Sequence, residues 1–384
     1  MFLEKDPGRR FQNPAELLKA MPTITGAIDA GRRITRKSLQ EMPPAASPVV
    51  TRKPPARFGQ FVSFILGRAN VSPAKPVEVF AIDQISKSND ALEIDHANAA
   101  QTIKYCRAPD GVRIAYAISG SGPPLVKAGN WMNHLEYDWE SPIWSHFFRG
   151  LSREHTLIRY DARGNGMSDW DVDRLSLDAW VTDLETVIDA VGIERFPLLG
   201  ISQGGAVAVT YAVRHPERVS HLILYGAFAL GGKKRSPAEK EKRDAMTTLM
   251  RLGWGADNPS FRQMFTGLFI PGGTHEQADY FNELCLKTTS PECAARYFDF
   301  DVCGDFDVTD LLSKVKAPTL VMHVRDDVIT PLEAGRQLAA GIPGARFIVF
   351  PGRNHLFLEH EPASNRFFEE ISLFLSSRRS EAWG

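Results

Sequence analysis

The chain has few of the features that would assign it to a specialised class of protein. Its 384 residues include four cysteines (Cys106, Cys285, Cys293 and Cys303), and none has the CxxC or Cys/His spacing of a metal site. No apolar run approaches the roughly 18 residues of a membrane span, so we expect none. The first residues, MFLEKD, carry charges where a secretory signal needs an apolar core. We therefore expect a cytoplasmic protein without a bound metal or other cofactor.

A strong excess of one charge is also missing. The formal net charge is -1 at pH 7, with 24% charged and 43% hydrophobic residues, which is typical of a globular protein and gives no reason to expect a nucleic-acid partner. The charge is uneven, however, because residues 1–75 hold thirteen Lys and Arg against five Asp and Glu. Dense prolines in MPPAASPVVTRKPPARFG disfavour helix and strand alike. We therefore predict that residues 1–100 form an N-terminal extension with a basic linker, loosely ordered over much of 38–100.

From about residue 102 the pattern changes to apolar strand-like runs that alternate with helical segments. The expected strands are 111–119, 125–129, 155–161, 196–202, 219–226, 318–324 and 345–350, and the expected helices are 142–152, 175–192, 203–215, 332–342 and 362–377. This alternation predicts an α/β fold, with a mainly parallel central sheet covered by helices on both faces. The core would comprise residues 101–228 and 313–384. Residues 229–312 break the alternation and predict a helical cap, inserted before the last two strands.

The sharpest chemical signal is the G-x-S-x-G motif around Ser202, in LLGISQGGA. The motif alone is weak, because glycine and serine are common residues. Its position makes it informative, since an apolar strand precedes it and a small-residue helix follows. A serine on such a tight strand-to-helix turn is exposed at the helix N-terminus, where developing negative charge is favoured. Ser202 is therefore a candidate nucleophile.

A serine hydroxyl needs a base, and in this architecture an acid and then a histidine should follow at the ends of the last strands. Asp326 and Asp327 come directly after the expected strand 318–324. His355 comes directly after the strand 345–350. The order of residues therefore predicts a Ser-Asp-His arrangement.

Residues 102–377 resemble the α/β-hydrolase superfamily, and most of all the bacterial hydrolase domains that are joined to signalling domains. The matching stretches are APDGVRIAYAISGSGPP, YDARGNGMSDW, GISQGG, HPERVSHLILYG, RDDVITP and GRNH. The resemblance implies that Ser202 is the nucleophile, that His355 is first base and then acid, and that an aspartate orients the imidazole. The family spacing, with the acid four residues before a proline, favours Asp327. In relatives the motif containing Asp161, Arg163 and Ser168 is a structural turn.

The resemblance also implies an oxyanion hole of two N–H donors. One is the amide of Gln203. The other comes from LVKAGNWMNH, where relatives carry His-Gly, so the donor here is either Asn130 or Trp131. Trp131, Trp139 and Phe265 are candidate substrate-binding residues, with packing in the core as the alternative for each.

Residues 1–20 resemble the C-terminal end of a bacterial Ser/Thr protein kinase domain, through Lys5, Asp6, Pro7 and Arg10. The chain contains no glycine-rich nucleotide loop, no HRD-like loop and no DFG sequence, which excludes kinase activity. This segment is expected to be a truncated reading frame, a relic of a kinase–hydrolase fusion, or a basic tail that docks on a partner or another subunit. A homo-oligomer formed through this extension or the cap is compatible with the sequence.

The leading hypothesis is a carboxylic ester hydrolase that acts through an acyl-enzyme on a small to medium, partly apolar ester. A lactonase, a C–C bond hydrolase or a cofactor-free haloperoxidase would use the same residues. The alternative from another class is a non-enzymatic small-molecule sensor with a hydrolase-like domain.

Overall fold

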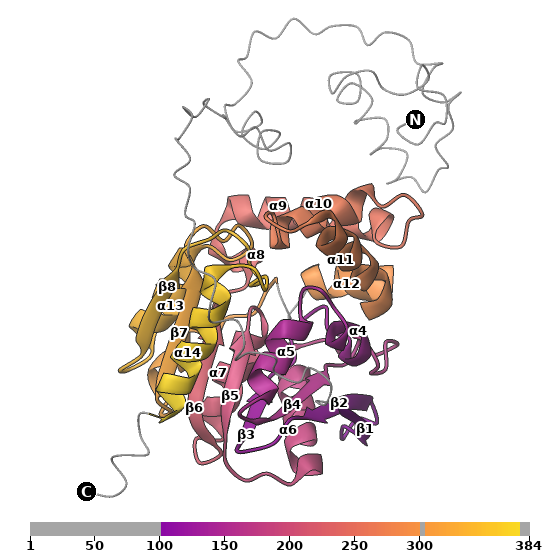
Figure 1. The fold of residues 1–384 in the computed structure, drawn as a ribbon. Coiled ribbons are helices and arrows are strands. Elements are labelled where there is room, and N and C mark those ends of the chain that lie inside the picture. Colours follow the sequence, from indigo (N-terminus) through magenta and orange to yellow (C-terminus); the bar gives the residue numbers. More distant parts are fainter. Residues whose placement is uncertain (1–100, 300–303, 377–384) are drawn as a thin grey trace, which may run out of the picture. The chain divides into compact units, whose positions relative to one another are not determined.

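The computed structural model describes residues 101–299 and 304–376. The kinase-like segment, the basic linker and Cys303 lie outside the described residues. Over the described part, the expected α/β fold with a mostly parallel sheet and helices on both faces is confirmed (Figure 1). Among the described helices, none is long and apolar enough to span a bilayer.

The centre of the fold is an eight-stranded sheet with the order β1-β2-β4-β3-β5-β6-β7-β8. The strands are β1 (Thr102–Arg107), β2 (Arg113–Ser119), β3 (Pro124–Lys127), β4 (Thr156–Asp161), β5 (Phe196–Ile201), β6 (Val219–Tyr225), β7 (Thr319–Val324) and β8 (Arg346–Phe350). β1 and β2 pair antiparallel, as do β2 and β4, and the remaining neighbours are parallel. The chain reverses its direction of travel across the sheet between β3 and β5. The loops that follow these two strands therefore meet at a topological switch point, where open α/β sheets place ligands.

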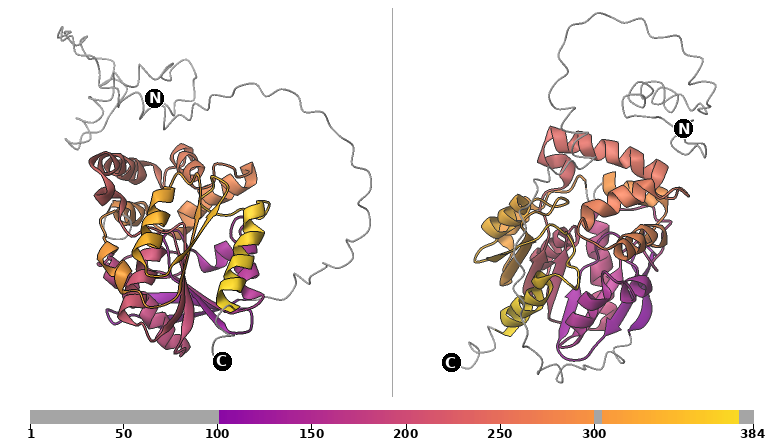
Figure 2. Two further views of the ribbon diagram at one scale, coloured as in Figure 1. Left: turned by 90° about the vertical axis from the view of Figure 1, so that its left-hand side faces the viewer. Right: turned by 45° about the horizontal axis from the view of Figure 1, so that its top comes forward.

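Helices cover the two faces of this sheet (Figure 2). Their apolar side chains pack against the strands in two large hydrophobic clusters, one on each face. One face carries α6 (Leu177–Val191), α7 (Gly204–Arg214) and α13 (Leu332–Gly341), and the other carries α5 (Ser145–Ser152) and α14 (Pro362–Ser376). The expected apolar face of α6 is buried through Trp180, Val181, Leu184, Val187 and Ile188. Ser176 caps its N-terminus, and Gly192 ends it in the left-handed conformation that glycine adopts without strain.

Between β6 and β7 the chain forms further helices, which lie beyond one end of the sheet in Figure 1. We call this inserted segment the cap, as a name for its position only. Its helices are α8 (Gly232–Arg235), α9 (Pro237–Gly253), α10 (Ser260–Phe269), α11 (His275–Thr288) and α12 (Pro291–Asp299), and a 3-10 turn, η2 (Thr309–Lys314), precedes β7. Trp254 in this segment is fully buried. Helices α10 and α11 pack together, with Phe265 and Phe281 buried.

Two elements have no counterpart in the predicted pattern. β1 has four exposed and two half-buried residues and no buried face, because it is an edge strand paired on one side. α4 (Leu135–Trp139) has five residues, too few to show a helical period. Its N-cap, His134, accepts a hydrogen bond from the Tyr137 amide at 3.2 Å.

Candidate functional site

Ser202 occupies the tight turn between β5 and α7. Its φ of +52° is in the left-handed region, one of two such values at non-glycine residues in the described chain. The turn is held from the next strand, because the Ser202 amide donates to the Tyr225 carbonyl at 2.9 Å. A Cβ on Gly200 would stand 2.8 Å from Gly205 Cα, so close packing of strand and helix requires glycine there. The half-buried Ser202 thus stands in the strained geometry that its motif predicts.

His355 and Asp327 come together from the loops after β8 and β7. The Nδ1 atom of His355 lies 2.6 Å from Asp327 Oδ2, and both side chains are 1% exposed. The second carboxylate oxygen accepts the amides of Ile329 and Thr330, at 2.8 and 3.0 Å. Burial alone would raise the pKa of Asp327, but His355 and the Thr330 amide hold it below its ordinary value. Asp327 is therefore a carboxylate at neutral pH, placed to fix the imidazole.

The same corner of the sheet fixes both Ser202 and His355. Tyr225 binds the Ser202 amide through its carbonyl, and its hydroxyl donates to the His355 carbonyl at 2.9 Å. A Cβ on Gly226, which has a φ of +55°, would stand 3.0 Å from His355 Cε1. The Nε2 atom of His355 is buried and has no hydrogen-bond partner within the described residues. An imidazole held at Nδ1 and free at Nε2 is suited to accept a proton from a nucleophile or donate one to a leaving group.

Asp326 differs from its neighbour, because its side chain is exposed. Its amide donates to the Gly352 carbonyl at 3.1 Å, a backbone contact between the β7 and β8 loops. His323, four residues before Asp327, is fully buried, and its Nε2 lies 2.7 Å from the Thr330 carbonyl. His323 therefore supports the loop that carries Asp327.

The loop after β3 lies against the Ser202 turn. The Ala128 amide donates to the Leu199 carbonyl of β5 at 2.8 Å, which extends the pairing of the two strands. A Cβ on Gly204 would stand 2.8 Å from the Gly129 carbonyl and 3.3 Å from Asn130 Cβ. The expected neighbours, Gln203 and Asn130, thus flank one small region at the N-terminus of α7, where helix amides lack intrahelical partners.

The Asn130 amide itself differs from the expectation. It donates to the side-chain oxygen of Asn133 at 3.0 Å, so it is already engaged in this structure. Trp131 is the next amide of the loop. A second oxyanion donor from this loop would therefore require either that Asn133 releases the Asn130 amide or that the Trp131 amide serves instead.

The three candidate substrate-binding aromatics have different environments. Trp139 is 6% exposed, and Arg149 and Arg159 lie over its ring at 5.0 and 5.4 Å, so it is a packed core residue. The Trp131 ring stacks on Trp254 at 5.7 Å and meets the edge of Phe265 at 5.6 Å. The loop after β3 is therefore joined to the cap through Trp131, while Phe265 is 1% exposed within the cap core.

Aromatic contacts continue from the cap toward the histidine. Phe269, at the end of α10, contacts Phe265 at 4.9 Å between ring centroids. It also meets His355 edge-on at 5.7 Å, and its carbonyl accepts the His355 amide at 2.8 Å. From the sequence alone Phe269 could be either a packed residue of the 229–312 segment or part of a pocket wall, because only the tertiary fold brings α10 to the β8 loop. The cap thus presents an apolar ring beside the imidazole.

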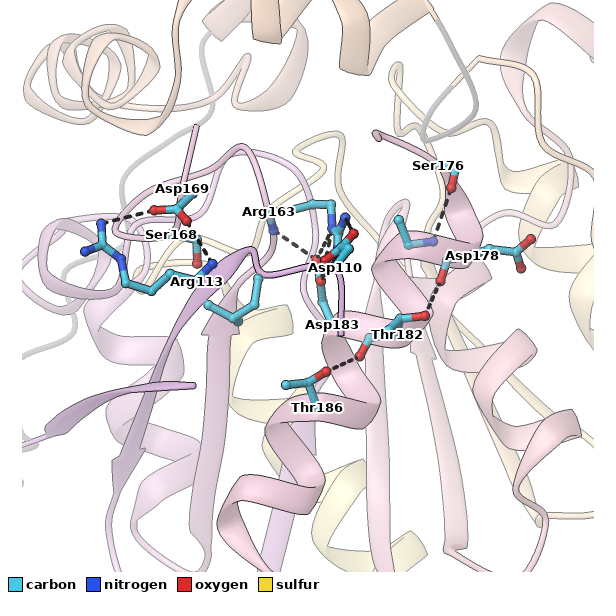
Figure 3. A network of polar contacts seen from close by, with 12 residues as sticks. Asp110, Arg113, Arg163, Ser168, Asp169, Ser176, Asp178, Thr182, Asp183 and Thr186 are labelled. Atoms are coloured by element: carbon cyan, nitrogen blue, oxygen red, sulfur yellow. Dashed lines mark hydrogen bonds and ion pairs between the residues drawn. The ribbon is translucent and has the colours of Figure 1, made fainter. Parts of the chain in front are cut away.

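The DARGNGMSD turn is a structural network, as its resemblance implied (Figure 3). The Arg163 guanidinium, 1% exposed, binds Asp183 of α6 at 2.7 Å and Asp110 of the β1–β2 turn at 2.6 Å. Ser168 accepts the Ala115 amide at 2.9 Å and donates to the Asp161 carbonyl. All these groups are occupied by internal contacts. Across the described residues, no three His, Cys, Asp or Glu side chains are grouped to hold a metal ion.

Comparisons with known proteins agree with this architecture. Residues 134–269 match the family described as the alpha/beta hydrolase fold. A 2-hydroxymuconate semialdehyde hydrolase from Pseudomonas sp. (strain CF600) is 30% identical over 276 residues, which are 69% of this chain and 87% of that relative. The AB hydrolase superfamily protein YisY from Bacillus subtilis is 27% identical over 277 residues, 70% of this chain and 98% of the relative.

Solved structures show the same fold. An esterase from Exiguobacterium antarcticum superimposes with a TM-score of 0.61 at 26% sequence identity, and the match covers 72% of this chain and all of that one (100%). The sheet order, the strained serine turn and these similarities lead to one assignment. The chain belongs to the α/β-hydrolase superfamily.

Proposed function

We propose that the protein is a carboxylic ester hydrolase with Ser202 as nucleophile, His355 as general base and acid, and Asp327 as the orienting carboxylate. Its substrate would be a small to medium ester with a partly apolar acyl group. The observation that carries the proposal is the buried His355–Asp327 contact of 2.6 Å, set beside the strained Ser202 turn on the Tyr225–Gly226 corner.

In the first half of the reaction, Ser202 Oγ attacks the ester carbonyl carbon while His355 Nε2 accepts its proton. The carboxylate of Asp327 stabilises the resulting imidazolium through the Nδ1–H bond. The oxyanion is bound by the Gln203 amide and by the amide of Asn130 or Trp131. The C–O bond then breaks, and His355 donates its proton to the departing alcohol.

In the second half, water attacks the acyl group on Ser202. His355 accepts one proton of this water and returns it to Ser202 Oγ as the carboxylic acid leaves. The Phe269 ring beside His355 favours an apolar acyl or alcohol portion and limits the access of water to the imidazole.

A second candidate is hydrolysis of a C–C bond. It is favoured by the 30% identity with a 2-hydroxymuconate semialdehyde hydrolase, whose match extends over 87% of that protein. The same three side chains would serve either reaction, so the contacts around the histidine do not separate the two substrates.

The direct test is hydrolysis of p-nitrophenyl acetate, butyrate and octanoate, followed by release of p-nitrophenolate. We expect turnover of at least one ester and a loss of about 10⁵- to 10⁶-fold in Ser202→Ala. A folded wild-type protein that cleaves none of them, or a Ser202→Ala variant that retains activity, would contradict the proposal. Loss of absorbance of 2-hydroxymuconate semialdehyde under the same conditions would instead support the second candidate.

A further inference from the structure

An unusual group of buried charges lies beneath the loop after β3. Lys127 ends an otherwise apolar strand and is 2% exposed, and its register partner on β4 is Arg159, which is 3% exposed. Both side chains point to the α5 face of the sheet. There the centroid of the Phe148 ring lies 6.0 Å from Lys127 Nζ and 4.2 Å from Arg159 Cζ. Burying two cations side by side is costly unless nearby groups compensate them.

Two carboxylates supply that compensation. Asp138 of α4 and Asp161 at the end of β4 are both fully buried. Burial disfavours the charged forms, which raises the pKa of Asp138 and lowers the pKa of Lys127, while the opposite charges of the cluster counteract both shifts. The group holds two cations and two carboxylates, enclosed between the sheet and α4. An apolar core of the same volume would serve stability as well or better.

All four members of the cluster bind the chain between β3 and α4: Lys127 and Asp138 bind the connecting loop, and Arg159 and Asp161 bind Leu135, the first residue of α4. Their contacts with it are Lys127 Nζ to Asn130 Oδ1 at 2.5 Å, Arg159 to the Leu135 carbonyl at 2.7 Å, the Leu135 amide to Asp161 at 3.0 Å, and the His134 amide to Asp138 at 3.0 Å. The loop contains a strained residue, Met132, with a φ of +66°. Charge-assisted bonds of this kind are short and strong, so they can hold such a loop in one conformation.

Asn130 is one of the residues of this loop that lie against the turn after Ser202. Its Oδ1 accepts from Lys127, and its Nδ2 donates to the Trp131 carbonyl at 3.0 Å. Its Cβ would lie 3.3 Å from a Cβ placed on Gly204, two residues after Ser202. The side chain of Asn130 is thus fixed at both polar atoms, and its backbone and that of Trp131 are fixed with it.

We infer that Lys127 is a positioning residue, whose bond to the side chain of Asn130 sets the place of the Asn130 and Trp131 amides beside Ser202. This inference rests on the proposed function, because it concerns the amides that would bind the oxyanion. Lys127 touches no reacting atom, so its effect passes through Asn130. An oxyanion donor acts mainly in the transition state, and its displacement lowers kcat more than it raises KM.

The test compares Lys127→Met, Asn130→Ala and the double variant, with kcat and KM measured on the p-nitrophenyl ester that the wild type hydrolyses best. Methionine keeps the length and apolar stem of lysine but cannot donate. We expect kcat to fall about 10- to 100-fold in each single variant with KM changed less than about threefold. Affinity for phenylboronic acid, which forms a tetrahedral adduct on an active serine, should fall by a similar factor. The double variant should be no slower than the slower single variant, because both changes remove one interaction.

A folded Lys127→Met protein with wild-type kcat would overturn the inference, as would losses that multiply in the double variant. If Lys127→Met does not fold, Asn130→Ala alone decides, since wild-type kcat in that variant also overturns it. Labelling of the wild-type protein by a fluorophosphonate, which reacts with an active serine, tests the proposed function separately from the role of Lys127. A wild-type protein that is not labelled contradicts the proposed function, whereas normal labelling together with unchanged variant kinetics contradicts only the role of Lys127.

Discussion

The neighbouring carboxylates Asp326 and Asp327 allow one chemical change to be made at a buried and an exposed position. Asp327 Oδ2 lies 2.6 Å from His355 Nδ1 inside the protein, whereas the Asp326 side chain is exposed. We expect Asp327→Asn to lose nearly all turnover and Asp326→Asn to stay within about twofold of wild type, because an exposed carboxylate whose side chain has no ion-pair partner among the described residues contributes little.

The magnitude follows from the role of the contact. A side-chain amide in place of Oδ2 would present an N–H to Nδ1, which favours the histidine tautomer with its proton on Nε2, and that form cannot accept the Ser202 proton. The equivalent loss in a serine protease is about 10⁴-fold, or about 5.4 kcal/mol at 1.36 kcal/mol per factor of ten. The amides of Ile329 and Thr330 can still bind the remaining oxygen, so the loop should keep its conformation.

The assay is kcat on the best p-nitrophenyl ester, combined with the urea midpoint of each variant to show that both are folded. The loss should be in kcat and should not be restored by higher substrate concentration. A folded Asp327→Asn variant with more than about a tenth of wild-type activity would refute this account of the acid. Equal losses in Asp326→Asn would show that the exposed carboxylate takes part.

Two further predictions concern the oxyanion loop and the Arg163 network. Gly204→Ala should lower kcat about 10- to 100-fold, because its Cβ would stand 2.8 Å from the Gly129 carbonyl and displace the loop after β3. The control is Gly267→Ala on α10, where a Cβ meets nothing within 4 Å. Equal kcat values in the two variants would contradict the steric argument. Asp110→Asn should cost about 1–2 kcal/mol at pH 7. Arg163 holds the pKa of Asp110 below its ordinary value, so this stability is present above about pH 4 and is lost as pH falls through the folded pKa. The urea midpoints of the wild type and Asp110→Asn, measured at neutral pH and at a pH below the folded pKa of Asp110, test this prediction. A difference between the two proteins that does not change with pH would contradict it.

Local pattern was enough to predict most of the framework. The predicted segment 196–202 corresponds to β5, which ends at Ile201, and the predicted segment 203–215 to α7, which begins at Gly204. Both are long apolar runs with turn residues at their ends, and their burial makes the pattern regular. β1 and α4 were missed for the opposite reason, because an edge strand and a five-residue helix carry no periodic apolar face.

The order of Ser202, the aspartates and His355 is also readable along the chain, since each follows an apolar strand. The contacts between them are not readable, because they join loops far apart in sequence. His355 and Asp327 are 28 positions apart, and Tyr225 and His355 are 130 apart. Their meeting depends on the adjacency of β6, β7 and β8, which is a property of the whole sheet.

The sequence by itself therefore determined the fold class, the strained serine turn and the candidate acid and base, because periodicity and turn chemistry are local. Only the tertiary structure decided that the Asn130 amide is engaged by Asn133, that Trp139 is core, and that Trp131 packs into the cap. It also brought Lys127 to Asn130. A lysine in the apolar run LVKAG was the available signal, but its meaning depends on Arg159 of the next strand and Asp138 of a short helix. Burial and charge compensation are collective, and no short stretch of sequence contains them.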